Sequence, residues 1–101
     1  MEFTESEKKL LKNQIVTKLS SEQEVCKIVL FGSFVKSNIP NDIDVAIFQD
    51  SNELYIPLSL KYRKLVRDIS KNIPIDILPL KVNAKGSFLS EISSGETIYE
   101  R

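Results

Sequence analysis

Three short apolar runs, each about as long as one β-strand, constrain the fold of this chain more than any other feature. The runs cover residues 25–31, 42–48 and 73–80, and valine and isoleucine make up much of each. Such runs are typical of buried strands, and the prolines at positions 74 and 79 favour a sheet edge for the third run. The sequence therefore predicts a small sheet built on these three strands.

Two apolar stripes at helical spacing place helices beside this sheet. Thr4 and Glu7 match a capping box, and the stripe behind them predicts a first helix that runs to about residue 19. A second stripe over residues 58–69 predicts a second helix. A short helical turn is predicted around residues 88–92, ahead of a glycine that ends it.

The length and composition predict a single folded domain, residues 1–101. The chain is 42% hydrophobic and 28% charged, which is ordinary for a globular domain, and 101 residues suffice for one two-layer core. The order helix, strand, strand, helix, strand, short helix predicts an α+β, two-layer architecture, in which helices pack on a small mixed β-sheet. Residues 97–99 are expected to return and pack on the core.

Composition excludes some functions and leaves others unsupported. The chain has no histidine and a single cysteine, Cys26, which excludes a histidine base, a zinc site and an internal disulfide. No segment approaches the roughly 18 apolar residues of a membrane span, so we expect a cytoplasmic protein with no membrane partner. Fourteen basic residues balance fourteen acidic ones, which gives no support for nucleic-acid binding.

Two like charges interrupt the second apolar run, and one interrupts the third. Because side chains alternate along a strand, Asp42 and Asp44 share one face while Ile43 and Val45 point into the core. Asp76 is the only polar residue of its run. Carboxylates that are buried, or that face one another at close range, are unfavourable unless their charges are neutralised. A ligand set made only of oxygen atoms suits Mg²⁺ or Mn²⁺. The pattern predicts a divalent metal site made of these three carboxylates.

A bare Asp-x-Asp pattern also has a simpler interpretation. Asp42 could cap a turn, Asp44 could face solvent at a strand end, and Asp76 could lie on an exposed strand face. The pair Gly32 and Ser33 favours the metal site, since glycine permits a sharp turn and serine adds a hydroxyl beside free backbone N–H groups. A strand that ends in Gly-Ser, followed by a strand that begins Asp-x-Asp, places phosphate-binding groups beside a metal site.

This combination resembles the Gly-Ser…Asp-x-Asp signature of the polymerase-β-like nucleotidyltransferases. The size and element order are similar to those of the stand-alone minimal nucleotidyltransferase (MNT) domains. The resemblance implies that Gly32 and Ser33 bind the nucleotide phosphates. It also implies that Asp42, Asp44 and Asp76 are catalytic and hold two Mg²⁺ ions, for which Mn²⁺ can substitute.

The resemblance further implies a reaction and a partner. Members of this family transfer a nucleoside monophosphate from a nucleoside triphosphate to an acceptor hydroxyl. Stand-alone MNT proteins are often antitoxins that bind a HEPN-domain ribonuclease toxin and add AMP to one of its tyrosines. The expected substrates are therefore ATP, or another nucleoside triphosphate, and a HEPN-type toxin. Whether the chain forms a homo-oligomer is left open.

One short segment departs from the family pattern. Many relatives have Ala-Arg-Gly where this chain has Val35, Lys36 and Ser37, and Lys36 is expected to keep a positive charge near the phosphates. The change leaves room for an alternative, a catalytically weak or inactive binding module that neutralises or scaffolds its partner. A small-molecule nucleotidyltransferase of the aminoglycoside type is a further alternative, which would need additional substrate-binding structure.

Overall fold

A four-stranded mixed sheet forms the middle of the fold in the computed structural model, which describes residues 2–87 and 89–101. The strands are β1 (Val25–Phe31), β2 (Ile43–Gln49), β3 (Ile75–Lys81) and β4 (Glu96–Glu100), in the spatial order β3-β2-β1-β4. β1 is antiparallel to β2 and β4, whereas β2 and β3 are parallel. The predicted small mixed sheet is confirmed, and β3 lies at an edge as its two prolines indicate.

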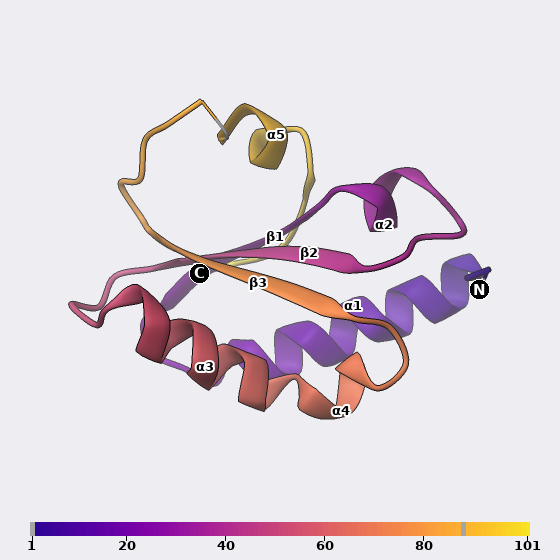
Figure 1. Cartoon of the computed structure of the whole chain (residues 1–101), viewed down its shortest axis with the longest axis horizontal. Helices are drawn as coiled ribbons and strands as arrows, with labels where there is room; N and C mark the ends of the chain where they lie inside the picture. The colour runs from indigo at the N-terminus through magenta and orange to yellow at the C-terminus, as the bar shows by residue number, and fades with distance from the viewer. Residues whose placement is uncertain (1, 88) are drawn as a thin grey trace.

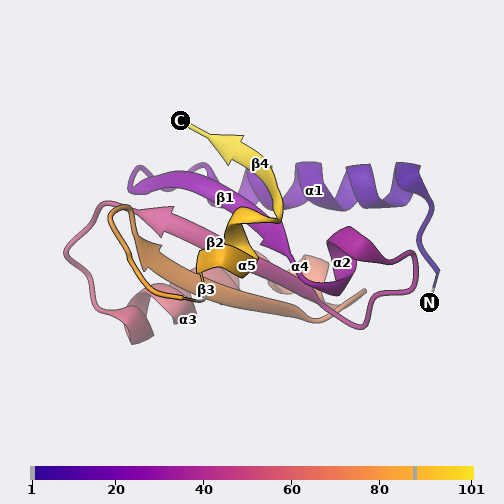
Figure 2. The same ribbon diagram turned by 90° about the horizontal axis from the view of Figure 1, so that it is seen from above.

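Helices cover the two faces of the sheet unequally. Figure 1 shows α1 (Glu5–Leu19), α3 (Tyr55–Leu65) and α4 (Arg67–Ser70) on one face, and α5 (Leu89–Ser93) on the other. In Figure 2, α1 lies on the side of β4 and α3 on the side of β3. A further short helix, α2 (Ser33–Lys36), follows β1 directly. Among the described residues, no helix has the length and apolar character needed to cross a membrane.

Side chains on the two faces of the sheet form two apolar clusters. The larger cluster lies between the sheet and α1, α3 and α4, and it includes Ile43 and Val45 of β2. The smaller cluster lies beneath α5 and joins Val29, Ala46 and Ile92. Because β2 is covered on both faces, a charged group within it requires a specific explanation.

The first helix forms as predicted. The Glu7 backbone N–H donates to Oγ1 of Thr4 at 3.1 Å, and the Thr4 N–H donates to the Glu7 carboxylate at 2.9 Å. Leu11, Ile15 and Leu19 are all buried against the sheet. The capping box and the apolar stripe are therefore both confirmed.

The second predicted helix is broken into two. α3 begins at Tyr55, before the apolar stripe, and Val66 separates it from α4 with φ of −101° and ψ of 13°. Val66 and Ile69 are only 1% and 4% exposed. With the break at this position, both side chains pack in the core. Helical periodicity alone does not reveal such a break, because the break depends on packing against the sheet.

Two other segments also differ from prediction. Residues 33–36, predicted as a turn, form the short helix α2. Residues 96–100, of which the sequence predicts only a return of 97–99 to the core, form β4, since the outer edge of β1 is available for pairing. The predicted turn at 88–92 corresponds to α5, although Phe88 itself lies outside the described residues.

Candidate active site

The three predicted carboxylates meet at one end of the sheet, on the face that carries α5. Asp44 is the second residue of β2 and pairs in register with Asp76 of β3. Asp42 lies just before β2, so alternation places it on the same side as Asp44. Ile43 and Val45 are fully buried in the larger cluster on the other face, as predicted.

The cluster has the composition and spacing of a divalent metal site. One carboxylate oxygen from each of Asp42, Asp44 and Asp76 lies within 4.8 Å of the others. Within residues 2–87 and 89–101, no lysine or arginine forms an ion pair with any of them. A set of oxygen ligands with no ion-pair partner suits Mg²⁺ or Mn²⁺. Because Asp76 is exposed, ligand positions on that side remain open to substrate oxygens.

Burial and neighbouring like charges both disfavour the ionised carboxylate of Asp44. Burial raises its pKa to about 6, with further contributions from the charges of Asp42 and Asp76, a hydrogen bond shared with Asp76, and the charge of Glu91 in α5. A bound divalent cation would favour the ionised carboxylate and reverse this effect. The unfavourable charge on Asp44 therefore favours the metal-site interpretation. The simpler interpretation, in which Asp42 caps a turn and Asp44 and Asp76 face solvent, is less favoured. No sequence signal indicates the nearby Glu91.

Gly32 brings the predicted phosphate-binding turn against the carboxylates. It is the N-cap of α2 and has a φ of +78°. A Cβ atom at this position would lie 2.3 Å from Oδ2 of Asp44, so only glycine allows the chain to turn here. Ser33 follows as the first residue of α2, where backbone N–H groups have no partner within the helix.

Lys36 lies at the opposite end of α2 from Gly32. It is the last residue of the helix, it is exposed, and it forms no ion pair within the described part of the chain. The structure does not bring it into the carboxylate cluster. Its role toward the phosphates stays a prediction.

A buried lysine that was not predicted from the sequence supports this corner of the molecule. Lys8 of α1 is 6% exposed, and its Nζ donates hydrogen bonds to the carbonyl oxygens of Phe34 at 2.8 Å and Ser37 at 2.6 Å. The same ammonium lies 5.1 Å from the centre of the Phe34 ring. Lys8 continues the stripe of Leu11 and Ile15 by one turn, and this position is the signal that could have identified it.

Replacing Lys8 with methionine is expected to destabilise the protein by roughly 2 kcal/mol, because two inward carbonyl groups lose a charged donor while the side-chain volume is kept. Urea denaturation followed by circular dichroism measures the change. The exposed neighbour Lys9 provides the control, since Lys9→Met should change the free energy of unfolding by less than about 0.5 kcal/mol. Equal stability of the two variants would contradict a supporting role for Lys8.

Comparison with known proteins identifies the family. The family model described as "Polymerase beta, Nucleotidyltransferase" matches residues 13–101. No curated protein matches the chain.

Solved structures share the fold. A chain in the structure of the tri-AMPylated Shewanella oneidensis HEPN toxin in complex with MNT antitoxin superposes with a TM-score of 0.69 and 21% identity, over 93% of this chain and 73% of that one. A chain in the structure of the toxin-antitoxin MntA-HepT gives a TM-score of 0.63 and 18% identity, over 92% of this chain and 73% of that one.

The match to the family model spans most of the chain, and it contains the glycine turn and all three carboxylates. At these low identities the solved structures show the fold, which agrees with the resemblance seen in the sequence. The chain therefore belongs to the polymerase beta nucleotidyltransferase family and has the fold seen in the MNT toxin-antitoxin structures.

Proposed function

We propose that this protein is a Mg²⁺-dependent nucleotidyltransferase that moves AMP from ATP to a hydroxyl group of a HEPN-type partner protein in the cytoplasm. The observation that carries the proposal is the set of three carboxylate oxygens within 4.8 Å of one another, directly beside the N-cap glycine of α2. The family membership and the AMPylated toxin in a similar complex support the same reaction.

Each of the three carboxylates would take a different part in binding metal. Asp42 and Asp44 would hold two Mg²⁺ ions between them, and Asp76 would complete the ligand set on the exposed side. When bound, the metal ions neutralise phosphate charge and lower the pKa of the acceptor hydroxyl. The residues fit this role because Asp44 carries an otherwise unfavourable charge that a cation would stabilise.

The transfer itself is a displacement at phosphorus. The acceptor oxygen attacks the α-phosphorus of ATP and forms a new P–O bond, while the bond from the α-phosphorus to the bridging oxygen breaks. Pyrophosphate leaves with that electron pair, and the proton of the hydroxyl passes to the carboxylate of Asp76. Since Asp76 is the exposed member of the cluster, a hydroxyl on a large partner can reach it.

The turn after β1 would hold the rest of the nucleotide. The Ser33 hydroxyl and the first backbone N–H groups of α2 are suited to donate to the β- and γ-phosphate oxygens. Lys36 would add a positive charge at the other end of this helix, but without the paired contact that arginine can make.

The proposal is tested by incubating the protein with Mg²⁺, ATP labelled at the α-phosphate, and the product of any adjacent reading frame as the candidate partner. Label should appear on the partner with α-labelled ATP, and not with γ-labelled ATP, because only the α-phosphate is transferred. Chelation of Mg²⁺ should abolish the labelling.

A specific negative result would support the alternative instead. If the partner is neutralised in the same mixture and gains no label, the protein acts as a non-catalytic binding module. The altered Val35–Ser37 segment would then be the first place to look for the loss of activity.

A further inference from the structure

A surface hollow lies at the outer edge of β3, and Asp76 of the carboxylate cluster forms part of its lining. Its volume is about 460 Å³. Figure 1 shows the elements that border it, with α3 and α4 running beneath the edge strand β3. The residues that matter most in its lining are Leu60, Arg63, Lys64, Arg67, Ile75 and Asp76. A molecule in this hollow would therefore lie beside the exposed carboxylate of the candidate active site.

The basic side chains of this hollow have no acidic partners. Arg63, Lys64 and Arg67 are exposed, and no carboxylate of residues 2–87 and 89–101 lies within 4.0 Å of their charged atoms. In the same helix, Lys61 pairs with three glutamates. The helix dipole favours Arg63 and Lys64 in the last turn of α3, but α4 has only four residues and gives Arg67 no comparable stabilisation. Stabilisation of the fold therefore accounts in part for Arg63 and Lys64, but not for Arg67.

Exposed apolar side chains extend the same surface toward the start of α3. Ile56 and Leu60 are 66% and 60% exposed, and their spacing places them on one face of the helix. Leu60 lines the hollow together with Arg63, Lys64 and Arg67, so the apolar and basic side chains adjoin. We call these five residues the α3–α4 stripe. An apolar patch that continues into unpaired basic charge is typical of a protein-binding surface, because a purely solvated helix face lacks the apolar part.

We propose that the α3–α4 stripe is the docking surface for the protein that accepts the nucleotide, and that this acceptor carries acidic side chains next to its reactive hydroxyl. The inference rests on the proposed function. Two observations carry it: the stripe presents unpaired positive charge, and the hollow it lines is shared with Asp76. Complementary charges would guide the acceptor to the exposed side of the cluster and fix its position there.

The first test is direct binding of peptides. Three fluorescent peptides of equal length would carry a central tyrosine flanked by glutamate, glutamine or lysine. Fluorescence anisotropy should show that the wild-type protein binds the glutamate peptide about tenfold more tightly than the lysine peptide. The variant Arg63→Glu/Arg67→Glu should reverse this order, and Arg63→Gln/Arg67→Gln should remove it. Circular dichroism checks that each variant is folded.

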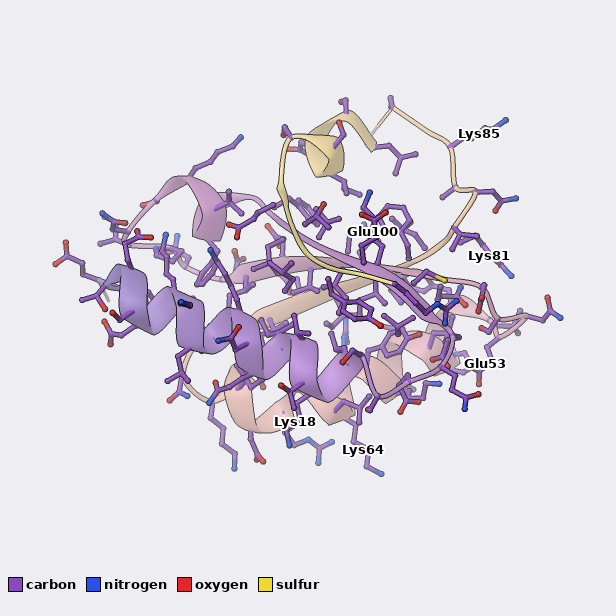
Figure 3. The ribbon with its side chains drawn as sticks, turned by 180° about the vertical axis from the view of Figure 1, so that it is seen from behind. Lys18, Glu53, Lys64, Lys81, Lys85 and Glu100 are labelled. Atoms are coloured by element: carbon purple, nitrogen blue, oxygen red, sulfur yellow. The ribbon has the colours of Figure 1, made fainter. Side chains whose placement is uncertain are left out.

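A matched control comes from basic residues on other surfaces. Lys9→Glu/Lys85→Glu changes the net charge by the same amount, and both side chains are exposed. Figure 3 shows Lys85 on the side of the molecule opposite to Lys64. This control should keep the preference for the glutamate peptide. If it loses the preference as well, only the net charge matters and the docking surface is wrong.

A second readout separates docking from catalysis. With α-labelled ATP and Mg²⁺, the glutamate peptide should be labelled with a KM about tenfold lower than that of the lysine peptide. Asp42→Asn/Asp44→Asn should still bind the glutamate peptide without labelling it. If the peptide binds as expected but no hydroxyl acceptor is ever labelled, the proposed function fails and the docking surface stands. If all three peptides are bound and labelled equally, transfer stands and the docking surface is overturned.

Two other occupants of the stripe would also overturn the inference. An oligouridine that displaces the glutamate peptide and loses its own binding in Arg63→Glu/Arg67→Glu would show a nucleic-acid surface. A wild-type dimer that becomes monomeric in the same variant, measured by sedimentation, would show that a second copy of the chain covers the stripe.

Discussion

Replacing Asp44 with asparagine should reduce nucleotidyl transfer by at least about a thousandfold while the melting temperature of the metal-free protein rises. Transfer falls because Asp44 is the central member of the carboxylate cluster, and the amide cannot hold a divalent cation with the same charge. Stability rises because the amide removes a charge that is partly buried beside Asp42 and Asp76. After allowance for solvent screening we expect a gain of about 1 kcal/mol, or roughly 5 °C.

The direction of the pH dependence follows from the raised pKa. The carboxyl group of Asp44 has a pKa of about 6 in the folded protein, whereas its ordinary pKa, which applies to the unfolded chain, is 3.8. Between these values the folded state binds more protons than the unfolded state, so wild-type stability falls as pH rises from about 4 to about 6 and is level above that. The advantage of Asp44→Asn should therefore be full at pH 8 and disappear below about pH 4.

Thermal unfolding at several pH values, with and without Mg²⁺, measures these effects. Added Mg²⁺ should raise the melting temperature of the wild type and leave Asp44→Asn nearly unchanged. Asp68→Asn provides a control for the loss of one acidic residue, because Asp68 is exposed in α4 and is not a member of the carboxylate cluster. If added Mg²⁺ does not change the melting temperature of the wild type, the result would count against a metal site at these residues.

Replacing Gly32 with alanine should abolish transfer and destabilise the protein by about 3 kcal/mol or more. The positive φ disfavours any side chain, and the new Cβ would lie 2.3 Å from Oδ2 of Asp44. Relief of that contact requires the carboxylate or the turn to move, and either movement separates the phosphate-binding groups from the cluster. Chemical denaturation and the labelling assay together measure both losses.

A double variant separates the two causes of this loss. In Gly32→Ala/Asp44→Ala the clash with the carboxylate is removed while the backbone strain at position 32 remains, so part of the stability should return and activity should not. Ser33→Ala, which removes a hydroxyl next to the turn, should leave the protein folded. If Gly32→Ala were as stable as Ser33→Ala, the close contact with Asp44 could not be as tight as the structure indicates.

The sequence predicted the parts of the fold that depend on local pattern. The first strand agrees at both ends, and the first helix follows its cap and stripe, since each pattern is decided by neighbouring residues. The break at Val66 and the pairing of β4 were not predicted, because both depend on what lies across the core or beside β1. The segment 96–100 has charged residues at both ends and little apolar character of its own.

The candidate site was predictable for a different reason. Asp42 and Asp44 share a face by strand alternation alone, and Asp76 stood out as the one charge in an apolar run. The contact between Gly32 and Asp44 and the buried ammonium of Lys8 needed the structure, because each joins segments that no periodic pattern connects. Lys8 also precedes residue 13, where the match to the family model begins.

The parallel pairing of β2 with β3 affects how the protein acquires its site during folding. β1 and β2 form an antiparallel pair joined by a short connection, so the contact of Gly32 with Asp44 can form early. Asp76 joins them only after the longer crossover through α3 and α4 has closed. A cation held by all three carboxylates can therefore stabilise only the completed sheet. We expect Mg²⁺ to slow unfolding more than it accelerates folding.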